Sequence, residues 1–235
     1  MMRKQIPNML TLANLFSGCI AITMAFQGNF KAVVIWVVVA ALFDFLDGVF
    51  ARLLKAYSGI GKELDSLADV VSFGVAPAAA VFILLRDDVL LPGFADPLRL
   101  CLPYLAFIMP LFSALRLAKF NTDERQTTSF LGLPTPANGL FWVSYCVGIQ
   151  TLSSGNASLF YVTIGLIFVF SWLMVSEIPM FSLKIKKMTL KGNERPLILS
   201  VLMIAFVALW GISGIAWGIL AYIVLSVARR PQIVK

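Results

Sequence analysis

Histidine is absent from this chain of 235 residues. That absence excludes imidazole-based acid–base or nucleophilic catalysis and histidine-ligated zinc. Cysteine occurs only three times, as Cys19, Cys101 and Cys146, each inside an apolar segment. Their positions form neither a disulfide framework nor a metal-binding spacing, so we interpret them as small hydrophobic residues within helices. Any chemistry must therefore use carboxylates, metal ions, lysine or arginine, and hydroxyl groups.

Charge is also scarce, because only 13% of the residues are charged, whereas 60% are hydrophobic and the mean hydropathy is +0.89. A soluble domain is about half apolar and one quarter charged. The composition predicts an all-α polytopic membrane protein, with residues 1–235 forming a single membrane domain. Each crossing needs about 20 apolar residues. Hydropathy indicates about eight such spans, at roughly residues 7–26, 32–53, 64–85, 100–119, 134–153, 157–182, 195–211 and 213–229.

The basic residues test this arrangement, since lysine and arginine accumulate on the cytoplasmic side of membrane proteins. With eight spans, one side carries only Lys31, Arg86 and Arg99, and the other side carries the remaining 16 of the 19 Lys and Arg residues. A turn at residues 211–214 is needed for this split, because joining the last two spans would move the C-terminal basic residues to the other side. We therefore expect a protein of the cell (inner) membrane with both termini in the cytoplasm.

Four aspartates gather in one short stretch: Asp44, Asp47, Asp65 and Asp69. Acidic residues at membrane depth are rare and usually functional. The first two are spaced i,i+3 and the last two i,i+4, so each pair shares one face of a helix. The predicted topology brings all four to the cytoplasmic side, where they would repel one another without cations. Oxygen ligands of this kind suit Mg²⁺, Mn²⁺ or Ca²⁺.

The residues around these aspartates allow two interpretations each. Gly48 and Ala51 either leave room for a ligand or serve ordinary helix packing, and Arg52 either binds a ligand or anchors the helix at the cytoplasmic surface. Three polar residues share a face of the first span and either contact a nucleotide or form hydrogen bonds between helices: Asn8, Thr11 and Asn14.

A second polar group closes the fourth span on the cytoplasmic side, with Arg116, Lys119 and Asn121. One interpretation is a pocket for the carboxylate of an amino-acid acceptor, because arginine binds carboxylates through two parallel hydrogen bonds. The other is a basic helix end that only satisfies the orientation rule. Arg116 is the strongest candidate for a ligand-binding role.

The spacing in this region resembles the complete signature of the CDP-alcohol phosphotransferases, Asp44-x₂-Asp47-Gly48-x₂-Ala51-Arg52-x₈-Gly61-x₃-Asp65-x₃-Asp69. Eight fixed positions with fixed gaps make a specific motif. The segments IPNMLTLANLFSG, SLADVVSFGVAPA, ALRLAKFN and FLGLPTPANG are similar to the phosphatidylserine synthase branch of that family. The resemblance covers residues 5–140, the expected catalytic core, and residues 141–235 are expected to add further membrane helices.

The resemblance implies a role for each matching residue. Divalent ions, Mg²⁺ or Mn²⁺ and two in number, would be held by a metal cluster of all four aspartates, Asp44, Asp47, Asp65 and Asp69. Asp69 would lie near the second ion and would also act as the general base. The residues that would contact the CDP part of the lipid are Gly48, Arg52, Ser58 and Gly61, to which the polar face of the first span adds Asn8, Thr11 and Asn14.

The implied reaction transfers a phosphatidyl or archaetidyl group from CDP-diacylglycerol or CDP-archaeol to the hydroxyl of L-serine and releases CMP, on the cytoplasmic side. The resemblance also implies a homodimer, in contact with membrane lipids and without a nucleic-acid partner. One alternative keeps this chemistry with another acceptor, such as glycerol 3-phosphate or an inositol phosphate. The other is an ion-coupled transporter, although the sequence contains no internal repeat of the kind common in transporters.

Overall fold

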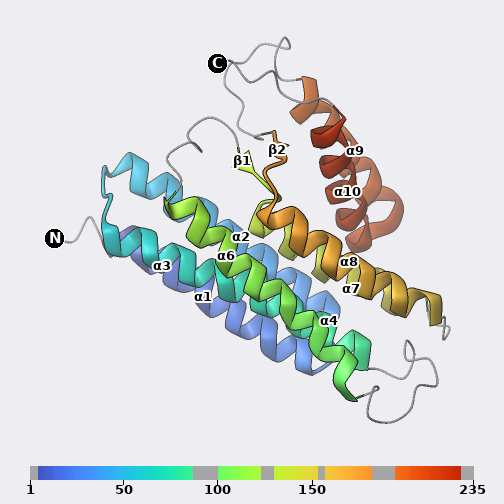
Figure 1. The fold of residues 1–235 in the computed structure, drawn as a ribbon. Coiled ribbons are helices and arrows are strands. Elements are labelled where there is room, and N and C mark those ends of the chain that lie inside the picture. Colours follow the sequence, from blue (N-terminus) through green and yellow to red (C-terminus); the bar gives the residue numbers. More distant parts are fainter. Residues whose placement is uncertain (1–4, 87–99, 123–129, 153–156, 182–193, 229–235) are drawn as a thin grey trace.

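The structure, a computed structural model, describes residues 5–86, 100–122, 130–152, 157–181 and 194–228. Within these ranges the regular structure is helical, apart from two short paired strands, so the predicted all-α membrane architecture is confirmed (Figure 1). By length and composition, six helical segments of the described residues could cross a membrane: 5–26, 30–53, 59–86, 102–122, 158–175 and 195–227. The count of eight spans stays a prediction, as does the cytoplasmic location of the termini, which lie outside the described residues.

The first two helices, α1 (Gln5–Phe26) and α2 (Phe30–Leu53), form a hairpin through a short turn. Gly28 has a φ of +70° in this turn, and the Asn29 side chain caps α2 by accepting a hydrogen bond from the Ala32 amide. The buried face of α1 consists of small and polar residues: Pro7, Thr11, Asn14, Ser17, Gly18, Ala21 and Ala25. Its large apolar side chains point outward, as expected where lipid is the solvent.

The third membrane segment is built from three successive pieces: α3 (Gly59–Asp69), the π-helix η2 (Val70–Val75) and α4 (Ala76–Arg86). Ser58 caps α3 by accepting a hydrogen bond from the Gly61 amide at 3.0 Å. The helix thus begins before the predicted start at residue 64, because its first turns are polar and carry no hydropathy signal. Residues 76–85 of α4 are all buried, which places this helix at the centre of the bundle.

The π-helix lies directly after Asp69 and is held between two other helices. A Cβ atom at Gly18 of α1 would come within 2.8 Å of the Ser72 Cα, and one at Gly139 of α7 (Thr135–Thr151) within 3.0 Å of the Phe73 Cα. Glycine lets helix backbones approach this closely in membranes. Both contacts fix the segment that carries Asp69.

The fourth segment starts as a 3₁₀-helix, η3 (Leu102–Phe107), and continues as α6 (Ile108–Thr122). The helix α8 (Ala157–Val175) ends before the predicted boundary at residue 182. After it, strand β2 (Pro179–Met180) pairs antiparallel with β1 (Phe130–Leu131). The backbone leaves the helix here because its hydrogen bonds are taken by the β1 region, with the Leu133 amide bonding the Leu173 carbonyl at 3.0 Å.

The last helices, α9 (Glu194–Trp210) and α10 (Gly214–Val227), pack against each other as a hairpin beside the main bundle (Figure 1). The 3₁₀ turn η5 (Gly211–Ser213) joins them, and Gly211 has a φ of +61°. A side chain at Gly214 would collide with the Phe206 carbonyl. The turn predicted at residues 211–214 is therefore confirmed, and α10 returns to pack on α7.

Candidate active site

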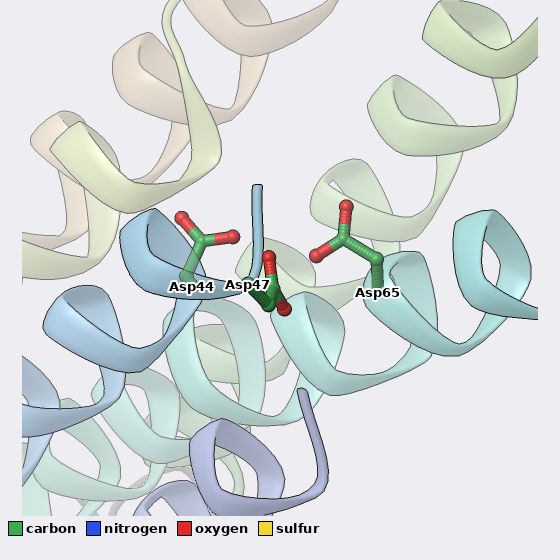
Figure 2. A group of neighbouring side chains, drawn as sticks. All are labelled: Asp44, Asp47 and Asp65. Carbon is green, nitrogen blue, oxygen red and sulfur yellow. The ribbon is translucent and has the colours of Figure 1, made fainter. Parts of the chain in front are cut away.

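Three of the four aspartates converge from two neighbouring helices. Asp44 and Asp47 lie on α2 and Asp65 lies on α3, and their side chains approach a common space (Figure 2). One carboxylate oxygen from each lies within 4.8 Å of the others. The i,i+3 spacing on α2 and the position of α3 beside it produce this convergence, as the sequence predicts.

The electrostatics of this cluster favour a cation. Like charges about 4 Å apart repel by about 4 kcal/mol at an effective dielectric constant near 20. The basic side chains nearest in sequence direct their hydrogen bonds elsewhere: Arg52 Nε donates to the Gly48 carbonyl at 2.9 Å, and Lys62 Nζ donates to the Asn121 carbonyl at 2.8 Å. Among the described residues, Asp65 Oδ1 is buried without a hydrogen-bond partner. The residues present thus fit a hard divalent ion, which would neutralise the charge and bind the unpaired oxygen.

Asp69 lies one turn beyond Asp65 on α3 and is only 7% exposed. It does not belong to the group of three, although it is close enough to Asp44 and Asp65 to interact electrostatically. Asn14 Nδ2 donates to Asp69 Oδ1 at 3.3 Å, and Ser72 Oγ donates to the Asn14 carbonyl at 3.0 Å. The Asn14 bond orients one oxygen of the Asp69 carboxylate, while the Ser72 bond, which goes to the backbone carbonyl of Asn14, connects the π-helix to α1.

For Thr11 and Asn14 of α1, one of the two interpretations was hydrogen bonding between helices, and the structure shows such bonds. Thr11 Oγ1 donates to Asp47 Oδ2 at 2.6 Å, and Asn14 supports Asp69 in the same way. Both side chains are at most 3% exposed. The polar stripe of the first helix thus supports two of the four carboxylates.

A polar cavity of about 190 Å³ adjoins the carboxylates on the side of the α2–α3 connection. A Cβ atom at Gly48 would meet no other atom within 4 Å, so this position is open, whereas one at Gly61 would lie 3.1 Å from Asn8 Oδ1. Arg52 is exposed and does not line the cavity. The lining includes five predicted nucleotide-binding residues and two of the aspartates: Asn8, Thr11, Gly48, Ser58, Gly61, Asp47 and Asp65.

Arg116 of α6 lies near Asp69, does not line this cavity and is only 7% exposed. Its Nη1 donates to Thr135 Oγ1 at 2.9 Å, and it interacts electrostatically with Asp69 and Tyr222. Its Nε has no partner among the described residues. A buried guanidinium with a free donor beside the catalytic region is suited to binding an anion.

The other two predicted acceptor residues are arranged differently. Lys119 is exposed. Asn121 Nδ2 donates to Ser66 Oγ at 2.8 Å and its carbonyl accepts from Lys62, so Asn121 connects α6 to α3. The structure thus brings Arg116 to Asp69, while Asn121 forms contacts between helices.

Sequence reasoning missed three residues that surround the predicted ones. Ser72 follows Asp69 in the π-helix, Thr135 belongs to the FLGLPTPANG segment, and Tyr222 comes from α10, near the end of the chain. The first two lie in segments already noted for their resemblance, but no role followed from their pattern. Tyr222 carries no sequence signal, because only the fold brings α10 back to Arg116.

The fold and the site together define a multi-pass membrane protein whose helices present clustered carboxylates beside a polar cavity. Residues 4–185 match the family model described as CDP-alcohol phosphatidyltransferase. The chain belongs to the CDP-alcohol phosphatidyltransferase family.

Curated relatives span most of the chain. A CDP-diacylglycerol–serine O-phosphatidyltransferase of Bacillus subtilis is 34% identical over 173 residues, which cover 74% of this chain and 88% of the relative. A protein of the same name from Helicobacter pylori is 35% identical over 79% of this chain and 75% of its own length. An archaetidylserine synthase of Methanothermobacter thermautotrophicus is 33% identical, over 74% of this chain and 68% of the relative.

Proposed function

We propose that this protein transfers a phosphatidyl or archaetidyl group from a CDP-lipid to the hydroxyl of L-serine and releases CMP. The observation that carries the proposal is the convergence of Asp44, Asp47 and Asp65 beside the polar cavity, with the buried Arg116 near Asp69. The names of the relatives, which include both phosphatidyl and archaetidyl enzymes, support serine as the acceptor.

In this proposal Asp44, Asp47 and Asp65 hold Mg²⁺ or Mn²⁺, two ions in all, with Asp69 beside the second. When bound, such ions neutralise the diphosphate and stabilise the negative charge that develops during transfer. The cavity lined by Gly48, Ser58, Gly61 and Asn8 receives the CDP group, and Arg52, which lies outside the cavity at the exposed end of α2, contacts the part of that group that projects from it.

The chain's own residues then carry out the proton transfer. Asp69, oriented by Asn14, accepts the proton of the serine hydroxyl. The serine oxygen forms a bond to the lipid-side phosphorus in line with the bridging oxygen, whose bond to that phosphorus breaks, and CMP leaves. Arg116 holds the serine carboxylate, with Lys119 and Asn121 at the same end of α6. Neither a histidine nor a covalent enzyme intermediate is required.

The cellular setting is part of the same proposal. The site faces the cytoplasm of the cell (inner) membrane, and the protein works as a homodimer surrounded by membrane lipids. Residues 5–140 form the catalytic core and residues 141–235 add further membrane helices. The segregation of basic residues in the sequence supports this orientation.

An acceptor panel tests the reaction. Purified protein with labelled CDP-diacylglycerol or CDP-archaeol should release CMP with L-serine, stop when EDTA removes divalent ions, and recover with Mg²⁺ or Mn²⁺. Ethanolamine, which lacks the carboxylate, should be a poor acceptor. Use of glycerol 3-phosphate or inositol phosphate instead of serine would refute the acceptor, and no CMP release with any acceptor would favour the transporter alternative.

A further inference from the structure

One buried side chain near Arg116 has no partner for either of its polar atoms. Asn138 of α7 is 0% exposed, and both its Nδ2 and its Oδ1 lack a hydrogen-bond partner among the described residues. Buried carboxamides in native proteins are almost always hydrogen-bonded, because an unpaired one destabilises the fold. A buried carboxamide with both polar atoms unpaired is therefore a candidate ligand-binding group.

The position of Asn138 relates it to the acceptor side of the site. It follows Thr135 by three residues in the first turn of α7, so the two side chains share a helix face. Thr135 accepts the hydrogen bond from Arg116, whose Nε is also buried and unpaired. The close contact of Gly139 with Phe73 fixes this turn of α7 against the segment that follows Asp69. Thr135 thus connects two buried groups with unpaired polar atoms: it bonds Arg116, which interacts with the proposed general base Asp69, and it shares a helix face with Asn138.

The unpaired atoms match a zwitterion. Arg116 Nε and Asn138 Nδ2 are donors, which suit a carboxylate, and Asn138 Oδ1 is an acceptor, which suits an ammonium group. Acceptors that carry a phosphate offer no ammonium for Oδ1, and ethanolamine offers no carboxylate for the donors.

We propose that Asn138 is a specificity-determining residue that completes the pocket for the amino-acid acceptor, using its carboxamide to bind the ammonium and carboxylate groups beside Arg116. This inference rests on the proposed use of serine.

The test is the Asn138→Leu variant of the full-length protein, which removes both polar atoms and keeps the branched arrangement of four side-chain heavy atoms. The KM for L-serine should rise about 10- to 100-fold, the usual effect of losing hydrogen bonds to charged groups. The KM for the CDP-lipid should change less than about threefold, which is small on this scale. The thermal midpoint should stay the same or rise, because an unpaired polar group is replaced by an apolar one.

Ser144→Ala is the matched control. Ser144 lies on the same helix, is 0% exposed and also has an unpaired buried Oγ, but it lines an apolar groove between α7, α8 and α10. Its removal should leave the serine KM unchanged. If both variants raise the serine KM equally, the effect is a general one of α7 and the inference is wrong.

The outcomes separate this inference from the proposed function. A wild-type protein that ignores serine overturns both, whereas a wild-type protein that uses serine, with an unchanged serine KM in Asn138→Leu, overturns only the role of Asn138. Should Asn138→Leu not fold, Asn138→Asp provides the measurement. That variant keeps an acceptor for the ammonium and repels the carboxylate. The ratio of kcat/KM for ethanolamine to kcat/KM for serine should therefore rise by about tenfold or more. An unchanged preference would contradict the proposal.

Discussion

At the scale of single residues, two of the clustered aspartates are held by the first helix as well as by their own helices. Thr11 donates a short hydrogen bond to Asp47, and Asn14 donates to Asp69. Such bonds orient a carboxylate and stabilise its charged form. Groups that hold a metal-binding side chain in this way typically change metal affinity by about 10- to 100-fold when they are removed.

Replacing Thr11 by valine tests this support. Thr11→Val keeps the shape and removes the donor, so the Mg²⁺ concentration for half-maximal activity should rise about 10-fold or more. Thr23→Val is the control, because Thr23 lies on the same helix but is exposed and bonds only the Ile20 carbonyl. Equal Mg²⁺ requirements in the two variants would show that the Thr11 bond does not support the metal site.

The two aspartates of α3 should differ in what their loss does. Asp69→Asn is expected to lower turnover by about 10²- to 10⁴-fold, as removal of a general base does, while Mg²⁺ still raises the thermal midpoint. Asp65→Asn should lose activity and also most of that Mg²⁺-dependent stabilisation, because its unpaired oxygen is a proposed metal ligand. Thermal unfolding with and without Mg²⁺ distinguishes them. Near-normal turnover of Asp69→Asn would remove it from the mechanism.

The sequence predicts part of the site well. Asp44, Asp47 and Asp65 could be found because helical spacing aligns the first two on one face of α2, and the short connection to the next helix keeps Asp65 close to them. The surroundings of Arg116 could not be predicted, because Thr135 and Tyr222 come from other helices and their contacts depend on how those helices pack. Unpaired buried atoms, such as those of Asn138, become visible only once burial is known.

At the scale of elements, the third membrane segment is fixed by contacts that only glycine allows. The π-helix after Asp69 meets α1 at Gly18 and α7 at Gly139. Closely packed protein interiors tolerate little added side-chain volume. The position of Asp69 along its axis is therefore set by neighbouring helices and not by α3 alone.

Adding one methyl group at this contact should be costly. Gly139→Ala brings a Cβ to 3.0 Å from Phe73 atoms, and we expect a loss of about 1–3 kcal/mol, the usual range for overpacking. Gly165→Ala on α8, where a Cβ would meet nothing within 4 Å, should be neutral or stabilising. Thermal or denaturant unfolding in detergent provides the comparison, and a stabilised Gly139→Ala protein would contradict the close packing described.

Hydropathy locates most helices, including the second, which begins at Phe30 instead of residue 32. It misses the polar start of α3 at Gly59, where the Ser58 cap is the only local signal. The π-turn cannot be predicted in this way, because its extra residue per turn leaves the apolar composition unchanged. The end of α8 at Val175 depends on pairing with β1, which is a distant contact.

At the scale of the whole molecule, the final hairpin extends from the exposed apolar surface to the buried Arg116. Most of α9 is exposed, and large apolar side chains of both α9 and α10 face outward, whereas one face of α10 is buried. Yet Tyr222 of α10 bonds the Phe181 carbonyl at 3.1 Å and interacts with Arg116. The C-terminal helices are therefore part of the surroundings of the acceptor side, which their sequence does not reveal.

The orientation of the bundle can be measured at two exposed lysines. In a variant with all three cysteines replaced by alanine, Lys55→Cys in the α2–α3 connection should react with an impermeant thiol reagent only after the membrane is opened. Lys31→Cys, at the other end of α2, should react in intact cells. The reverse pattern would invert the predicted topology. The sequence supports this prediction through its uneven distribution of basic residues, many of which lie outside the described ranges.

At Gly48, the residue that would best stabilise the helix differs from the residue that keeps the proposed CDP cavity open. A glycine inside a helix costs about 0.5–1 kcal/mol relative to alanine, and here no neighbouring atom demands it, since an added Cβ would meet nothing within 4 Å. Gly48→Ala should thus raise the thermal midpoint while its methyl group fills part of the cavity and raises the KM for the CDP-lipid. Laboratory evolution for heat resistance alone would select this substitution early, and the most durable variants would then be the least active ones.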